Sequence, residues 1–321
     1  MTGARLNEQA RGVYIIAATP FTDTGAVDLE GVDRLVAFYL ERGVHGITIL
    51  GMMGEANKLT AEEAESVALR FIRAAGGRVP VVVGVSAAAL VSLVGLSRRA
   101  MDAGAAGVMV APTPGLRTDE QIYAYCERVI AELGPDIPVV YQDYPQSTGV
   151  PLSVPLWNRM VDAFPSLVML KHEDCPGLAK LSRIRAEERR DGRRRVSILV
   201  GNGALYFLEE LGRGADGAMT GFAFPEMLVG VHERFAAGDR EGAAALFDAY
   251  LPLVRYEQQP GYGLAVRKEI LRRRGALRTA FARYPAPALG PEGAAEIDGL
   301  LDRLRRRLGE VDAAHARAVA A

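Results

Sequence analysis

The chain has 321 residues, of which 49% are hydrophobic and 24% charged, and its formal net charge is -1. This balance is typical of a globular protein and gives no reason to expect a nucleic-acid-binding surface or an acidic tail. The two cysteines and four histidines lack metal-ligand spacing, and no segment is apolar enough for a secretion signal or a membrane span, so we expect a cytoplasmic protein without a metal site.

Eight short apolar runs suited to strands alternate with segments of helical periodicity. The expected strands are 13–18, 46–50, 79–85, 107–110, 137–141, 167–171, 196–200 and 215–219. The expected helices are 29–42, 61–75, 90–103, 119–133, 153–163, 177–190, 204–212 and 225–237. Eight uninterrupted units of this kind predict a closed TIM (β/α)8 barrel, because the rival open sheet would need a dinucleotide or phosphate-binding fingerprint that the sequence lacks.

Three more helical patterns follow the eighth unit, at 240–256, 261–274 and 293–309. We therefore expect the barrel to occupy 1–238 and a C-terminal helical extension, 239–321, to pack on it. In such barrels the chemistry lies where the carboxyl ends of the strands meet the loops that follow them. That rule selects the residues considered next.

The sixth expected strand is apolar until it ends in Lys171. A desolvated lysine amine can lose its proton near neutral pH and attack a ketone to form a Schiff base. On this segment alone, a lysine that reaches out to water is the plainer interpretation. Glu173 lies two residues on and would point to the same side, where it could act as a base or merely form an ion pair.

The fifth expected strand ends in Tyr141, whose phenol could relay a proton or could simply lie at the barrel rim with a backbone partner. The second strand ends in a glycine-flanked turn whose backbone N–H groups suit a substrate carboxylate, although a plain turn has the same pattern. The residues of that turn are Gly51, Met52, Met53, Gly54 and Glu55.

Two other strand ends are compact enough to let a ligand approach the backbone. The seventh strand ends in Gly201 and Asn202, and the eighth leads into Gly221 and Phe222. We interpret these four residues as walls of the same pocket.

These motifs resemble the class I aldolases and dehydratases of the dihydrodipicolinate synthase and N-acetylneuraminate lyase superfamily. The resemblance covers nearly the whole chain, through ATPFTDTGAVD, GMMGE, YQDYPQSTG, LKHED and GADGAMTG. It implies that Lys171 forms a Schiff base with a 2-keto acid, that Tyr141 relays protons and that the GMMGE turn holds the keto-acid carboxylate. It also implies an enzyme without a cofactor, assembled as a dimer or tetramer, whose partner is a small 2-keto acid.

Departures from dihydrodipicolinate synthase argue against that activity. Where the synthase has two threonines, this chain has Met52 and Met53, and Ser147 replaces the synthase's arginine. YQDYP, LKHED and LPLVRYEQQPG are similar instead to 2-keto-3-deoxy sugar acid dehydratases, in particular those acting on L-2-keto-3-deoxyarabonate, where a glutamine and a glutamate matching Gln142 and Glu173 take part. Dehydration of such a sugar acid is therefore expected, with a retro-aldol lyase that releases pyruvate, or a non-catalytic keto-acid-binding protein, as alternatives.

Overall fold

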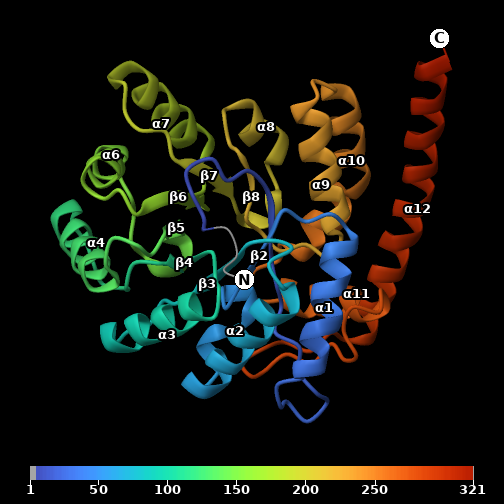
Figure 1. The fold of residues 1–321 in the computed structure, drawn as a ribbon. Helices are drawn as coiled ribbons and strands as arrows, with labels where there is room; N and C mark the ends of the chain where they lie inside the picture. Colours follow the sequence, from blue (N-terminus) through green and yellow to red (C-terminus); the bar gives the residue numbers. More distant parts are fainter. Residues whose placement is uncertain (1–4, 321) are drawn as a thin grey trace.

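Eight parallel strands close into a barrel, and helices surround it (Figure 1). The computed structural model describes residues 5–320, and side chains as far as residue 311. Residues 1–4 of the predicted barrel region and residue 321 of the predicted C-terminal extension lie outside the described residues. Each strand pairs with its neighbours in sequence, and β8 closes the barrel against β1. The predicted (β/α)8 barrel is confirmed.

The predicted strands and helices occur in the predicted order along the chain. The strands are β1 (Gly12–Ile16), β2 (Gly46–Ile49), β3 (Val81–Gly84), β4 (Gly107–Val110), β5 (Val139–Asp143), β6 (Leu167–His172), β7 (Ser197–Val200) and β8 (Gly217–Ala218). The barrel helices are α1 (Leu29–Glu41), α2 (Ala61–Ala75), α3 (Leu90–Asp102), α4 (Asp119–Leu133), α5 (Pro145–Thr148), α6 (Val154–Ala163), α7 (Leu178–Asp191), α8 (Phe207–Gly212) and α9 (Pro225–Ala236). Single turns of 3-10 helix occur at Met52–Gly54 (η1), Ala56–Lys58 (η2) and Asn202–Ala204 (η3).

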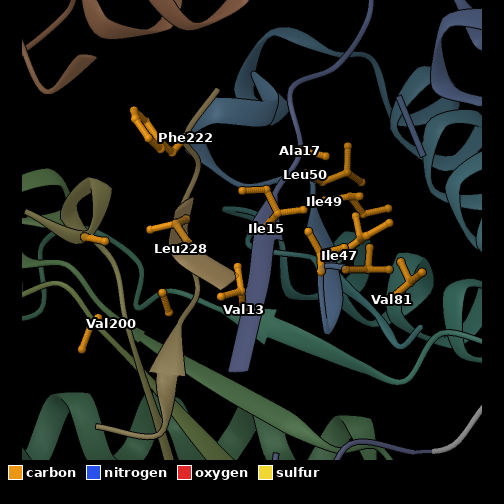
Figure 2. Close-up of a cluster of buried hydrophobic side chains, with 14 of the residues drawn as sticks. Val13, Ile15, Ala17, Ile47, Ile49, Leu50, Val81, Val200, Phe222 and Leu228 are labelled. Carbon is orange, nitrogen blue, oxygen red and sulfur yellow. The ribbon is translucent and has the colours of Figure 1, made fainter. Parts of the chain in front are cut away.

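Alternate residues of each strand serve two separate hydrophobic clusters. In β1, Val13 and Ile15 belong to the large cluster between strands and helices, part of which Figure 2 shows. Tyr14 and Ile16 belong to a smaller cluster that also contains residues of β3, β4, β5, β6 and β7 and therefore fills the barrel interior. Strand alternation thus decides which side chains can face a pocket at the top of the barrel.

The boundaries of β8 and α8 differ from the sequence prediction. β8 is only Gly217–Ala218, shorter than the predicted 215–219. α8 begins at Phe207 rather than at 204, because Asn202, Gly203 and Ala204 form a 3-10 turn with positive φ angles. Positive φ is incompatible with a helix start there, so the chain after β7 forms a tight loop.

The C-terminal helices are α10 (Arg240–Glu257), α11 (Gly263–Arg273) and α12 (Pro291–Ala320). α10 packs on α9 of the barrel, and α12 runs along the outer side of α10 and α11 (Figure 1). Among the described residues, no helix is long and apolar enough to cross a membrane. The connection between α10 and α11 passes over the barrel mouth, where it becomes part of the candidate site.

A buried carboxylate in α8 gives a stability prediction. Burial, and then the nearby charge of Glu209, raises the pKa of Glu210 from its ordinary value to about 8. The folded state therefore keeps a proton that the unfolded state releases near pH 4.5, and stability is lost as the pH rises from 4.5 to about 8. Glu210→Gln removes this loss, so urea unfolding should show a gain of about 2 to 4 kcal/mol over the wild type at pH 8, since each pKa unit corresponds to about 1.4 kcal/mol.

The same variant should show little gain at pH 5, where the wild-type carboxyl is protonated in both states. Glu209→Gln is the matched control, because Glu209 is exposed on the same helix and should change the free energy of unfolding by about 0.5 kcal/mol or less. A gain for Glu210→Gln that is equal at pH 5 and pH 8 would contradict the assignment of a buried proton.

Candidate active site

A cavity of about 450 Å³ opens at the carboxyl ends of the strands. Its wall comes from β1, β6 and the loops after β2, β5, β7 and β8, together with the segment that joins α10 to α11. The lining residues are Ile16, Met52, Met53, Tyr144, Gln146, Ser147, Lys171, Glu173, Asn202, Gly203, Thr220, Gly221, Glu257, Gln258, Gln259, Pro260, Gly261, Gly263, Leu264 and Arg267.

Three predicted catalytic residues meet at the Glu173 carboxylate, and two of them, Lys171 and Glu173, line the cavity. Lys171 is buried, and its Nζ lies 3.0 Å from Oε2 of Glu173. The Nε2 of Gln142 donates a hydrogen bond of 2.7 Å to the same oxygen. Gln142 and Lys171 are register partners on β5 and β6, which places both side chains on one face of the sheet. The structure therefore groups an amine, a carboxylate and an amide around one oxygen atom.

The Glu173 side chain is held in place by the loop after β7. A methyl group at Gly201 would lie 2.1 Å from Cγ of Glu173, so the carboxylate arm packs directly on the glycine backbone. Asn202 donates from Nδ2 to the carbonyl of Glu173 at 2.8 Å. Of these two predicted wall residues, Asn202 lines the cavity, whereas Gly201 acts by leaving room for Glu173.

The chain has four lysines, and the structure describes all of them. Lys58 and Lys268 both bind the carboxylate of Glu55, while Lys180 pairs with two aspartates that do not line the cavity. Of the four, only Lys171 lines the cavity. It is therefore the lysine amine that a ligand in this cavity would meet.

The structure contradicts the prediction that Tyr141 faces the pocket. Val140 belongs to the cluster inside the barrel, so Tyr141 points outward, where its ring lies near Trp157 of α6. Its hydroxyl is buried without a hydrogen-bond partner among the described residues, and burial raises its pKa well above the ordinary value. A phenol in this position keeps its proton and cannot reach a ligand.

The phenol that does line the cavity is Tyr144, which sequence reasoning did not select. It follows β5 directly, and burial, then the charge of Glu173, raises its pKa. Tyr144 is therefore a protonated hydrogen-bond donor close to the carboxylate. Its position in YQDYP, immediately before a proline, was visible in the sequence, but the length of β5 was needed to choose between the two tyrosines.

The turn after β2 divides into lining residues and supporting residues. Met52 and Met53 line the cavity. The N–H of Gly54 donates to the carbonyl of Gly51 at 3.0 Å, so this amide closes the turn and is not free for a ligand. The prediction that Glu55 binds substrate is wrong, because its carboxylate is buried away from the cavity and accepts bonds from Lys268, Lys58 and the Arg283 amide.

The two predicted residues after β8 have different positions. Gly221 lines the cavity, and a methyl group there would lie 2.3 Å from Nη1 of Arg267. Phe222 belongs to the large cluster of buried hydrophobic side chains, in which Figure 2 labels it. Its ring centroid lies 5.7 Å from that of Phe224 and 6.2 Å from that of Tyr250. Phe222 is therefore a core residue, which corrects the prediction that it forms the pocket wall.

Sequence reasoning missed the contribution of the C-terminal extension. Residues 257–261, 263 and 264, with Arg267, cover one side of the cavity. Gly203 lies so close to Gln258 that a methyl group at 203 would come within 1.8 Å of the Gln258 Nε2. The sequence signal for this contribution to the cavity was the polar run from Glu257 to Gln259, which lies between two helical patterns.

The sequence pattern of the dihydrodipicolinate synthetase family matches residues 9–303, nearly the whole chain. The chain belongs to this family. Its members are lyases, and the barrel described above is their fold. The cavity at the strand ends, with its paired lysine and glutamate, is therefore the candidate active site of a family lyase.

Three relatives show the breadth of the family. L-2-keto-3-deoxyarabonate dehydratase of Azospirillum brasilense is 32% identical over 298 residues, covering 92% of this chain and 94% of the relative. A crystal structure of dihydrodipicolinate synthase from Rhodopseudomonas palustris is 48% identical, with a TM-score of 0.91 over 94% of this chain and 100% of that one. A prophage protein of the family from E. coli, solved in complex with pyruvate, is 26% identical, with a TM-score of 0.83 over 92% of this chain and 98% of that one.

Proposed function

We propose that the protein is a Schiff-base lyase that dehydrates a 2-keto-3-deoxy sugar acid, of which L-2-keto-3-deoxyarabonate is the leading candidate. The observation that carries the proposal is Lys171 in the cavity, 3.0 Å from Glu173, with Gln142 bound to the same carboxylate oxygen. The Azospirillum brasilense relative, named for this activity, supports the substrate class.

In the proposed reaction, the amine of Lys171 attacks the C2 ketone, and loss of water leaves a protonated imine. Glu173 lies beside that nitrogen and takes a proton from C3, so the C3–H electron pair moves into the imine and forms an enamine. The enamine then expels the C4 hydroxyl, which leaves as water with the proton from Glu173. Hydrolysis of the conjugated imine frees Lys171 and the unsaturated keto acid, which for a pentonate rearranges to 2-oxoglutarate semialdehyde.

The other groups at the cavity have assigned tasks in this proposal. The amides of Met52 and Met53 hold the substrate carboxylate, because the Gly54 amide is engaged within the turn. Gln142 orients the Glu173 carboxylate. Tyr144 takes the place first given to Tyr141, as the phenol that can donate to a substrate oxygen.

A retro-aldol reaction that releases pyruvate is the second candidate, favoured by the pyruvate complex of the E. coli relative. It uses the same imine but breaks C3–C4 instead of C4–O. The synthase activity named for the Rhodopseudomonas palustris relative is not proposed here, because Met52, Met53 and Ser147 stand where the synthase pattern has two threonines and an arginine.

The test is borohydride trapping with pyruvate and with L-2-keto-3-deoxyarabonate, followed by mass mapping over the chain's four lysines. We expect a reduced adduct at Lys171 with both keto acids, and 2-oxoglutarate semialdehyde without pyruvate as the product of turnover. Release of pyruvate would establish the aldolase alternative. An adduct without any turnover would indicate a binding protein, and no adduct at Lys171 would refute Schiff-base chemistry.

A further inference from the structure

Arg267 is an unusual component of the cavity wall. It lies in α11, its side chain is 3% exposed, and its Nε donates to Oε2 of Glu257 at 2.8 Å. Its Nη1 is buried and has no hydrogen-bond partner among the described residues. A buried guanidinium N–H without a partner is costly, so such a group in a cavity wall indicates a missing ligand atom.

Nη1 lies in the part of the cavity wall that follows β8. It lies next to Gly221 at the end of β8, where even a methyl group would come within 2.3 Å, and both residues line the cavity. Glycine at 221 therefore leaves the room in which this nitrogen lies beside the cavity.

The residues that line the cavity come from only part of the ring of strand ends. Beyond Lys171 it continues through Asn202 and Thr220 to Arg267, while the ends of β3 and β4 supply none of the lining residues. A keto acid with C2 at Lys171 and its carboxylate at the turn after β2 would therefore extend its remaining carbons along β7 and β8. Its far end would meet Arg267.

We propose that Arg267 is a specificity-determining residue whose Nη1 donates a hydrogen bond to the terminal hydroxyl of a hydroxylated 2-keto acid. This inference rests on the proposed function and names the part of the substrate that the cavity selects. The charge of Arg267 is balanced by Glu257, so the site suits a neutral hydroxyl rather than a second carboxylate.

The experiment compares two keto acids of equal chain length, L-2-keto-3-deoxyarabonate and 2-oxopentanoate, which has no hydroxyl groups. The readout is the concentration of each that gives half-maximal borohydride trapping at Lys171. Arg267→Met should raise this concentration about 10- to 100-fold for the sugar acid, as expected for a lost bond from a charged donor, and less than about threefold for 2-oxopentanoate.

Two further variants make the test decisive. Gly221→Ala retains the Arg267 side chain and its charge, but the added methyl group would lie 2.3 Å from Nη1 and displace it, so this variant should weaken the sugar acid selectively even if Arg267→Met folds poorly. Arg272→Met is the matched control, because Arg272 is on the exposed side of the same helix and pairs with Glu269.

Equal weakening of both keto acids, or no weakening of either, in Arg267→Met and Gly221→Ala would overturn the assignment of Arg267. A wild-type protein that forms no adduct with either compound would instead refute the proposed Schiff-base chemistry. The two failures are therefore distinguishable.

Discussion

Replacing Lys171 with methionine or arginine is expected to lower turnover of the keto-acid substrate by at least about 10⁴-fold, because the covalent intermediate cannot form. The two replacements separate charge from nucleophilicity. Arginine can keep a cation beside Glu173, but its guanidinium stays protonated and cannot form an imine. A steady-state assay of product formation would measure turnover, and borohydride trapping would measure imine formation.

Lys180→Met is the matched control for these variants. Lys180 is also largely buried and also pairs with carboxylates, but it does not line the cavity. It should lower stability while leaving the adduct at Lys171 intact. Substantial turnover by Lys171→Arg, confirmed as folded by circular dichroism, would show that the lysine acts only through its charge.

The barrel and its lysine were predictable because both depend on local patterns. Apolar runs of strand length alternate with helical periodicity, and helix starts also depend on neighbouring residues, as in the capping box that Thr60 and Glu63 form at the start of α2. Lys171 was found because it is the first charged residue of a buried strand. A parallel barrel places that kind of residue at the functional end.

Tyr141 was assigned to the wrong face of its strand, because the side to which each side chain points is harder to predict than the presence of the strand. The sequence ends the fifth strand at 141, but β5 continues to Asp143, and a register irregularity between Val139 and Val140 shifts its pairing with β6. Parallel strands buried on both faces have no polar alternation to show which side faces inward. Only the membership of Val140 in the interior cluster resolves the choice.

Glu55 and Arg267 could not be assigned from the sequence because their partners are distant or belong to the C-terminal extension. Glu55 lies in a motif typical of ligand binding, yet its partner Lys268 is 213 positions away. Local sequence periodicity does not indicate a pairing between residues so far apart in the chain. The extension was expected to pack outside the barrel, whereas its α11 both lines the cavity and anchors the turn after β2.

Lys268→Met is expected to lower the free energy of unfolding by about 2 to 4 kcal/mol, somewhat less than the loss of a sole buried partner, because Glu55 keeps its bonds from Lys58 and the Arg283 amide. The Nζ of Lys268 lies 2.5 Å from Oε1 of Glu55, and both side chains are 1% exposed. Burial lowers the pKa of Lys268 to about 8, although Glu55 opposes this shift, so the ammonium depends on the carboxylate. Urea unfolding at pH 7 would measure the loss.

The double variant Glu55→Gln with Lys268→Met tests whether the two residues act together, because removing both charges should cost less than the sum of the single changes. Arg128→Met is the control: it breaks an exposed pair with Glu132 on α4 and should cost about 0.5 kcal/mol or less. The turn of Met52 and Met53 precedes Glu55 directly, so Lys268→Met should also weaken keto-acid trapping. A stability loss no larger than that of the control would show that this pair does not hold the turn.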